Sequence, residues 1–433
     1  MKKQANSFDI LVNERNILKD IKAWRNLAEL VNLQSESTLI TNALSNIIKD
    51  LTEHAIPISL FKAIQKGLLL NEWDDAVESF NLQKKRPINF YLGPMRMMES
   101  QPSSLGFILT MAKQEANDIV NSVEFYASEI GTRIFGFPCH FHGRNVEFYD
   151  IILAAGPFAN TEGKYIALFT PFYLDGWKDT YRQISGRRSI LFHNLIKIRF
   201  NTLTKPIAAD HLQIDNKSPN FLSATEEEID KAIVLWLTLH ELIHGSGPLP
   251  LFQGAISKLS LGLCYAGIEE MRVDMTVWLL LGQCHDLFGH IAEIARHIIL
   301  AERLLRSARS GLWSNPKSGW IQKSSDGEHG ALWLTLLLKG GAIQKKDEQH
   351  LVINVEQVDT LLREILQQLY IVETQVANNS SLGQNQLIKF ANSLRERLFS
   401  SSNGNFEYPL KALTILNEFK KYPTHIDLRF LIK

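Results

Sequence analysis

The chain has 433 residues, enough for two or three domains and a large core. Its 46 basic and 46 acidic residues give a formal net charge of zero, which argues against a nucleic-acid or anionic-membrane partner attracted by bulk charge. Three cysteines are too few, and odd in number, for a disulfide framework. Residues 1–9 lack the apolar stretch of a secretory signal, and no apolar run reaches the roughly 18 residues of a membrane span, so we expect a cytoplasmic protein.

Residues 1–120 are predicted to form a helical N-terminal region. Apolar residues recur at intervals of three and four over residues 8–75, which is the period of an amphipathic helix. Residues 84–100 contain prolines and a short apolar stretch, which fits a strand or a junction. Residues 107–120 again follow a helical pattern.

Residues 121–215 are predicted to form a β-rich region that lines a cleft. Four segments in it are rich in β-branched and aromatic residues, and Gly, Pro and Asn separate them. We therefore place a small sheet or partial barrel here and interpret residues 205–224 as a linker. The four segments are residues 123–126, 133–137, 146–153 and 165–173.

Residues 216–345 are predicted to form a helical catalytic region, followed by a C-terminal helical region over residues 346–433. The catalytic region begins with a capping box, in which Thr225 caps a helix and Glu228 reaches back. A polar loop is expected at residues 313–328. The other expected helices cover residues 267–281, 291–308, 329–340, 354–377, 384–399 and 408–421. The predicted fold class is therefore α+β and mostly α.

The helix after the capping box contains the sequence His240-Glu241-Leu-Ile-His244, which has the form H-E-x-x-H. Residues four apart on a helix lie about 6 Å apart along its axis and on one face, so both imidazoles can reach one metal ion. Glu241 stands beside them, where it could polarise a metal-bound water. The Gly-Ser-Gly-Pro sequence that follows His244 ends the helix.

A catalytic zinc usually has three protein ligands and one open position. Glu270 and Asp274 lie four apart on an otherwise apolar helix face, where carboxylates are costly unless they are paired or bind a metal. We assign Glu270 as the third zinc ligand, and Asp274 as the acceptor that orients a ligand histidine. Glu269 is expected to orient a ligand histidine or to pair with Arg272.

Other interpretations of these residues stay open. The two histidines could be ordinary core residues, with the glutamates paired to Arg272. Two histidines and a carboxylate would also suit iron, cobalt or manganese. The segment Cys139–His142 is better explained as an ordinary strand end than as a second metal site, because two further ligands are missing from view.

The motif from His240 to Leu249, with Glu269-Glu-Met-Arg-Val-Asp274 after it, resembles the dipeptidyl peptidase III family of zinc metallopeptidases. That family has H-E-x-x-G-H followed by G-S-G, and then E-E-C-R-A-E/D. This chain has the five-residue H-E-x-x-H in place of the six-residue motif. The resemblance extends over residues 120–345 and implies a zinc-dependent peptidase with two lobes and a wide cleft, one lobe helical and zinc-binding, the other with a small β-barrel or sheet.

The resemblance also implies roles for residues away from the metal. Residues 123–133 are similar to the family's I-E-T-Y-R-D-P-F-G-S-R segment, so that Glu124 would bind a substrate ammonium and Tyr126 would stabilise the oxyanion of the transition state. His329 matches the histidine of the family's H-x-x-A-R sequence and would be a second stabiliser. Trp333 stands where the family has the arginine of that sequence.

The same resemblance places Asn194 at the cleft as a substrate-binding residue, although a plain strand or loop edge explains it equally well. Our first functional hypothesis is a zinc-dependent metallohydrolase that cleaves amide or peptide bonds of short peptides, with Glu241 moving the proton of a zinc-activated water. The alternative is a specialised zinc enzyme on the same scaffold, acting by hydrolysis, elimination or isomerisation on a small non-peptide metabolite. A third is a binding protein with a structural zinc, for which the buried acid Glu241 would be unnecessary.

Overall fold

The chain divides into two compact units, which are described separately. Unit 1 comprises Met1–Asp118, Gly143–Ile198 and His425–Lys433, and unit 2 comprises Ile119–His142 and Arg199–Thr424. The four regions predicted from the sequence follow other boundaries, since residues 121–215 contribute to both units, and they stay a prediction. The computed structural model describes residues 21–50, 56–83, 86–96, 102–137, 144–159, 166–175, 187–251, 258–314, 324–347, 350–379, 383–402 and 405–426.

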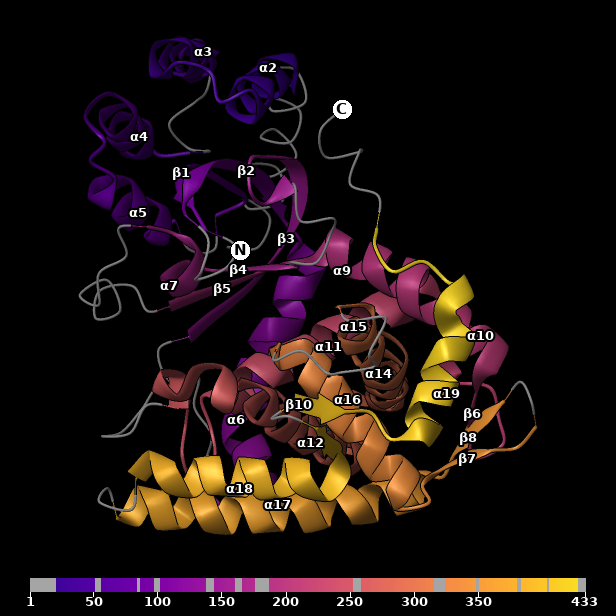
Figure 1. Ribbon diagram of the computed structural model, residues 1–433. Helices are drawn as coiled ribbons and strands as arrows, with labels where there is room; N and C mark the ends of the chain where they lie inside the picture. Colours follow the sequence, from indigo (N-terminus) through magenta and orange to yellow (C-terminus); the bar gives the residue numbers. More distant parts are fainter. Residues whose placement is uncertain are drawn as a thin grey trace. The chain divides into compact units, whose positions relative to one another are not determined.

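Unit 1 is built on a five-stranded sheet with strand order β1-β2-β3-β5-β4 (Figure 1). Neighbouring strands are antiparallel except for β3 and β5, which are parallel. The strands are β1 (Ile88–Met95), β2 (Ser104–Ala112), β3 (Arg144–Ala155), β4 (Ala167–Phe169) and β5 (Arg187–Phe192). Residues 107–112 thus belong to a strand, and the helix expected over residues 107–120 begins only at Gln114.

The expected N-terminal helices are present in the described part of unit 1. They pack on the sheet through an aromatic core, in which the Trp24 and Phe61 rings lie 5.1 and 5.4 Å from the Phe90 ring. These helices are α2 (Ile21–Asn32), α3 (Ser37–Asp50), α4 (Ile58–Leu70) and α5 (Asp74–Asn81), and short α7 (Thr170–Tyr173) follows β4.

One long helix, α6 (Gln114–Phe135), corrects our interpretation of residues 123–126 and 133–137 as strands. The aromatic and β-branched residues there favour strands locally. However, the apolar residues that become buried recur at intervals of three and four, as a helix requires, and burial of this stripe outweighs the local preference. They are Ala116, Val120, Val123, Ala127 and Ile130.

Unit 2 is mainly helical. Helix α12 (Ala266–Gln283) is its central element, because it packs against α11 (Glu226–His244), α14 (His290–Ala301), α16 (Ser325–Lys339) and α17 (Val355–Asn378). Figure 1 shows α17 beside α18 (Gly383–Leu398). The remaining helices of unit 2 are α10 (Lys205–His211), α13 (His285–Phe288), α15 (Ala308–Ser314) and α19 (Leu410–Glu418), whereas α9 (His193–Arg199) belongs to unit 1 except for its last residue.

Short elements complete unit 2. The segment expected to be a linker at residues 205–224 is largely ordered, since it contains α10, a strand and a 3₁₀ turn. Small sheets have the orders β6-β8-β7 and β10-β9. The elements are β6 (Leu212–Ile214), β7 (Ile343–Lys345), β8 (Leu351–Ile353), β9 (Ser400–Ser402), β10 (Asn405–Glu407), the π-helical turns η2 (Phe200–Thr204) and η5 (Glu302–Ser307), and the 3₁₀ turns η3 (Asn220–Leu222), η4 (Lys258–Cys264) and η6 (Phe419–Lys421).

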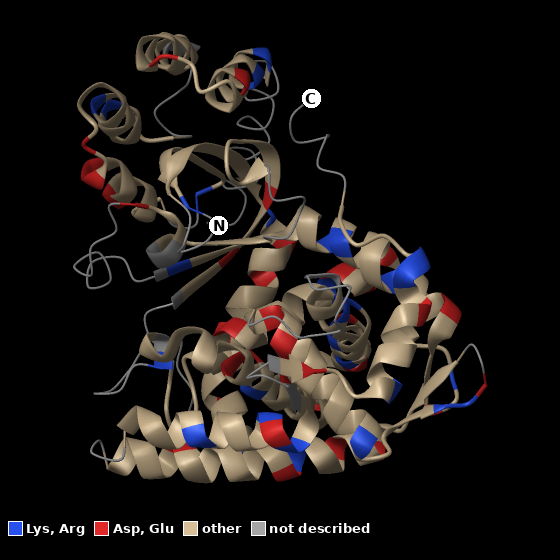
Figure 2. Cartoon of the chain, viewed as in Figure 1, with Lys and Arg blue, Asp and Glu red and all other residues tan. Residues whose placement is uncertain are grey.

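The predicted α+β, mostly helical class is confirmed. Figure 2 shows basic and acidic residues mixed along the helices of both units, in keeping with the zero net charge. None of the helices in the described ranges is both long enough and apolar enough to cross a membrane.

Candidate metal centre

Helix α11 carries the two histidines and begins at the expected capping box. The Thr225 hydroxyl accepts from the Glu228 backbone N–H at 3.2 Å, and the Glu228 carboxylate accepts from the Thr225 backbone N–H at 2.8 Å. Acidic residues in the first turn complement the helix dipole. The helix ends at His244, and His240, Glu241 and His244 near this end are all buried.

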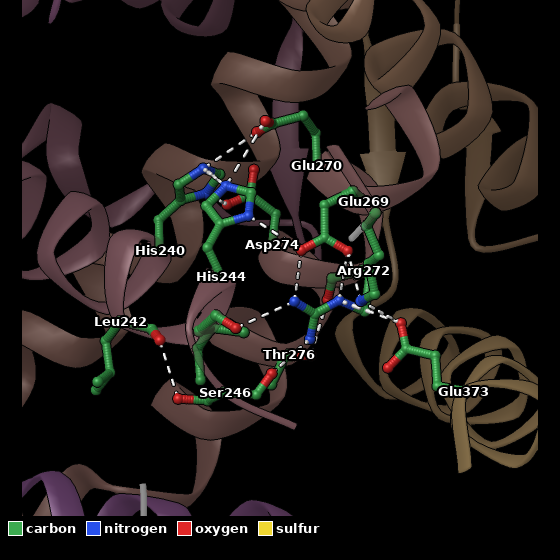
Figure 3. Close-up of polar contacts among 12 residues, drawn as sticks. His240, Leu242, His244, Ser246, Glu269, Glu270, Arg272, Asp274, Thr276 and Glu373 are labelled. Carbon is green, nitrogen blue, oxygen red and sulfur yellow. Dashed lines mark hydrogen bonds and ion pairs between the residues drawn. The ribbon is translucent and has the colours of Figure 1, made fainter. Parts of the chain in front are cut away.

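Helix α12 brings a carboxylate to the same point (Figure 3). The Nε2 atoms of His240 and His244 lie 3.1 Å apart. Glu270 Oε2 lies 3.1 Å from His240 Nε2, and Glu270 Oε1 lies 3.6 Å from His244 Nε2. One ligand atom from each residue therefore falls within 4.8 Å of the other two, the spacing expected of a metal site.

The outward nitrogen of each histidine faces a second carboxylate. His240 Nδ1 lies 2.8 Å from Asp274 Oδ1, and His244 Nδ1 lies 3.1 Å from Glu269 Oε1. Donation of the Nδ1 proton to these carboxylates leaves both Nε2 lone pairs directed at Glu270. Two lone pairs and a carboxylate that converge in this way repel one another unless a proton or a cation lies among them, so the donor set fits a divalent metal ion.

The charges around the site favour a cation. Burial lowers the pKa of the His240 imidazole, but Asp274 and Glu270 outweigh burial and raise the pKa to about 10. Burial raises the pKa of the Glu270 carboxyl, while His244 and His240 hold it well below its usual range. The negative electrostatic potential that keeps a proton on the buried His240 imidazole also favours a metal ion in the place of that proton.

A buried network of charges supports the His244 side, and the sequence predicted its pair of Glu269 with Arg272 but not its other members, Lys258 and Glu373. Arg272 Nη2 donates to Glu269 Oε1 at 2.6 Å, and Lys258 Nζ donates to Glu269 Oε2 at 2.9 Å. Lys258 also donates to Glu373 Oε1 on α17 at 2.6 Å (Figure 3 shows Glu373 beside Arg272). Lys258 lies on η4, in the connection between α11 and α12, and Glu373 lies on α17, so neither stands at a helical spacing from His244 that would reveal the contact.

Trp236 and Arg303 support the His240 side and were also missed. Trp236 Nε1 donates to Asp274 Oδ1 at 2.9 Å, and Arg303 Nε donates to Asp274 Oδ2. Trp236 lies one helical turn before His240, so its spacing was a usable signal. Arg303 is on η5, and the sequence contains no sign of that contact.

Glu124 and Tyr126 lie on α6, and neither belongs to the group formed by His240, His244 and Glu270. Both are partly buried, and the Tyr126 ring packs edge-on against Phe125 at 5.1 Å and Phe288 at 6.4 Å. Residues two apart point to nearly opposite sides of a helix, whereas on the expected strand they would share a face. Their substrate roles remain predictions.

His329 is fully buried on α16, with Nε2 3.6 Å from Asp274 Oδ2. Burial and the Arg303 guanidinium lower its pKa to about 3, so its imidazole is neutral at pH 7.

Asn194 lies in unit 1, where its side-chain amide forms hydrogen bonds with the backbone of β3. It accepts from the Ile151 N–H at 3.0 Å and donates to the Ile151 carbonyl oxygen at 2.8 Å. Its substrate-binding role stays a prediction. The segment Cys139–His142, which we expected to be an ordinary strand end, lies outside the described ranges.

Comparison with known proteins finds a likeness in structure only. No family model and no curated protein match the sequence. The fold is similar to that of dipeptidyl peptidase III from Caldithrix abyssi, with a TM-score of 0.63 and 16% identity over 90% of this chain and 69% of that one. It is also similar to dipeptidyl peptidase III from Corallococcus sp. strain EGB, with a TM-score of 0.60 and 14% identity over 92% of this chain and 70% of that one. The chain therefore has a divergent dipeptidyl peptidase III-like fold.

Proposed function

We propose that this chain, with its dipeptidyl peptidase III-like fold, is a zinc-dependent metallohydrolase that cleaves amide bonds of short peptides. The observation that carries the proposal is the buried convergence of His240, His244 and Glu270, with Glu241 adjacent in sequence to the first ligand. The peptidase names of the two structural neighbours support the reaction class.

Two imidazole nitrogens and one carboxylate oxygen are a ligand set typical of catalytic zinc, which keeps a position open for water or substrate. When bound, zinc would lower the pKa of a water to about 7 and polarise the substrate carbonyl. Asp274 and Glu269 would hold the two imidazoles in the tautomer that offers Nε2 to the metal.

The remaining steps fall to the chain's own side chains. The Glu241 carboxylate would take the proton of the attacking water and return it to the leaving amine. His329, being neutral, would stabilise the developing oxyanion as a neutral N–H donor and not as a cation. Tyr126 would supply a second donor, Glu124 would bind the substrate ammonium, and Asn194 would contact the substrate.

One observation favours a non-peptide substrate as the second candidate. Trp333 is fully buried one helical turn after His329, and the two rings lie 6.0 Å apart. An indole is uncharged and offers a single N–H, so it cannot form the bidentate ion pair with a substrate carboxylate that an arginine would form. A zinc enzyme that acts on a small uncharged amide or another non-peptide metabolite would not need such an ion pair.

The Glu241→Gln variant tests the proposal. Zinc-loaded wild type is incubated with mixed peptides of three to eight residues, and products are read by mass spectrometry. We expect the variant to keep one zinc per chain and to lose turnover by about 10²–10⁴-fold, the usual contribution of a general base. Glu227→Gln, an exposed acid on the same helix, is the matched control and should leave turnover unchanged.

The possible outcomes separate the candidates. N-terminal dipeptides released only by proteins that keep Glu241 support the peptidase. Intact peptides, from a protein shown to hold stoichiometric zinc, favour the small-metabolite enzyme. A fully active Glu241→Gln variant contradicts the mechanism, and a wild type that binds no divalent metal contradicts both candidates.

A further inference from the structure

Two π-helical turns in unit 2 contact each other, and one of them reaches the candidate metal centre. They are η2 and η5. Such turns account for well under 1% of residues, and they are frequent at functional sites because their wider winding is costly and is retained for a purpose. Glu302 joins the two turns, accepting a hydrogen bond from the Thr204 hydroxyl and lying 3.5 Å from Arg199.

Turn η5 places Arg303 against the metal centre. The Arg303 Nε–H donates to Asp274 Oδ2, and the guanidinium carbon lies 5.2 Å from the centre of the Trp236 ring. Trp236 in turn donates its indole N–H to Asp274 Oδ1 at 2.9 Å. Asp274, Arg303 and Trp236 therefore form a closed set of contacts in which each member touches the other two.

This set fixes the orientation of the Asp274 carboxylate as well as its charge. Oδ1 accepts from both Trp236 and His240, while Oδ2 is held by Arg303. Rotation of the carboxylate would break contacts on both oxygens together. An arginine can hold one oxygen through a fixed Nε–H while its plane lies over an aromatic ring, and a lysine ammonium cannot do both.

Simple charge neutralisation is the competing explanation. A buried carboxylate needs a cation, and Arg303 could supply no more than that. The two explanations differ for Arg303→Lys, because a lysine would restore the charge but not the geometry.

We propose that Arg303 and Trp236 are positioning residues of the metal centre, which act through Asp274 to aim the His240 imidazole at the metal. The proposal rests on the proposed metal-binding function. It adds a structural purpose for the π turn, since the widened winding over residues 302–307 carries the residue that holds Asp274.

The test measures the metal and not the reaction. Co²⁺-substituted wild type, Arg303→Lys, Arg303→Met and Trp236→Phe are compared by visible absorption, which reports ligand geometry, and by zinc affinity in chelator competition. Arg306→Met is the matched control, because Arg306 lies on the same turn and pairs with Glu302, not with Asp274. Circular dichroism checks that each variant is folded.

Partners of a ligand histidine typically contribute about 10–100-fold to metal affinity. We expect Arg303→Lys and Trp236→Phe to bind zinc about 10-fold more weakly with an altered Co²⁺ spectrum, and Arg306→Met to match the wild type. If Arg303→Lys keeps the wild-type spectrum and affinity, Arg303 only neutralises charge and the proposal is wrong. If Arg303→Met does not fold, the Arg303→Lys and Trp236→Phe results decide. A wild type that binds no metal overturns the proposed function together with this inference, whereas a metal-binding wild type with unaffected variants overturns the inference alone.

Discussion

The buried ion cluster behind His244 makes a quantitative prediction about stability. It consists of Lys258, Glu269, Arg272 and Glu373, whose side chains are all at most 4% exposed. Two cations and two anions leave it neutral. Glu373→Gln keeps the shape of the side chain and removes one anion, so that Lys258 and Arg272 must share Glu269 alone.

Breaking a buried pair by removing one partner typically costs about 3–5 kcal/mol, because the remaining charge stays desolvated. We expect Glu373→Gln to reduce the free energy of unfolding by about this amount. In Lys258→Met/Glu373→Gln the uncompensated cation is also gone and the pair of Arg272 with Glu269 is neutral. The double variant should therefore be more stable than the sum of the two single losses predicts, with a coupling of about 2–3 kcal/mol.

Urea denaturation of the wild type, both single variants and the double variant gives this coupling. The matched control is the pair of Lys345 and Glu418, which has the same 2.6 Å separation but lies near the surface. Its coupling should be below about 1 kcal/mol, since water screens exposed pairs. If the buried pair shows no more coupling than this surface pair, the reasoning from burial is wrong.

Three further predictions follow from other parts of unit 2. Burial lowers the pKa of His297 from 6.5 to about 4, and its Nδ1 accepts a hydrogen bond from the Asn220 backbone N–H. The folded state therefore holds the neutral imidazole, and this contribution to stability is fully present above pH 6.5. We expect about 3 kcal/mol of the free energy of unfolding to be lost as the pH falls to about 4. In thermal melts, the stability of His297→Asn should depend less on pH between about 4 and 6.5 than that of the wild type. An unchanged pH dependence would mean that other titratable groups cause it. Gly330→Ala would put a Cβ 2.6 Å from the Ser307 carbonyl carbon. We expect the free energy of unfolding, measured by chemical denaturation, to fall by about 1–3 kcal/mol. An unchanged free energy of unfolding would mean that η5 shifts to make room without a cost in stability. Zinc at about 100 times its Kd should raise the free energy of unfolding by about 2.7 kcal/mol over chelator-treated protein, and in His240→Ala this gain should disappear.

Local chemistry made helix α11 predictable. Thr225 and Glu228 form a capping box whatever the rest of the chain does, because every partner lies within one turn. The four-residue spacing of His240 and His244 likewise places both imidazoles on one face of any helix that forms there. Glu270 was predictable because a carboxylate on an apolar helix face needs a partner.

Helix α6 shows where such reasoning fails. The stretch from Val123 to Tyr126 has the composition of a strand, and the competing helical stripe is apparent only over the longer window that runs to Ile130. The strand interpretation put Glu124 and Tyr126 on one face, and the helix separates them. The longer repeat dominates because it buries a continuous apolar stripe, whereas strand preference is worth only a fraction of that burial.

The sequence by itself determined the helical character of the chain, the pair of histidines on one helix and the need for a carboxylate partner, since each depends on residues within a few turns. The tertiary structure decided which distant side chains hold that site. Lys258 and Glu373 on the His244 side, and Arg303 on the His240 side, reach the centre only because η4, α17 and η5 are folded against it. A contact between residues far apart in the chain leaves no local spacing to read, because it is set by how whole helices pack.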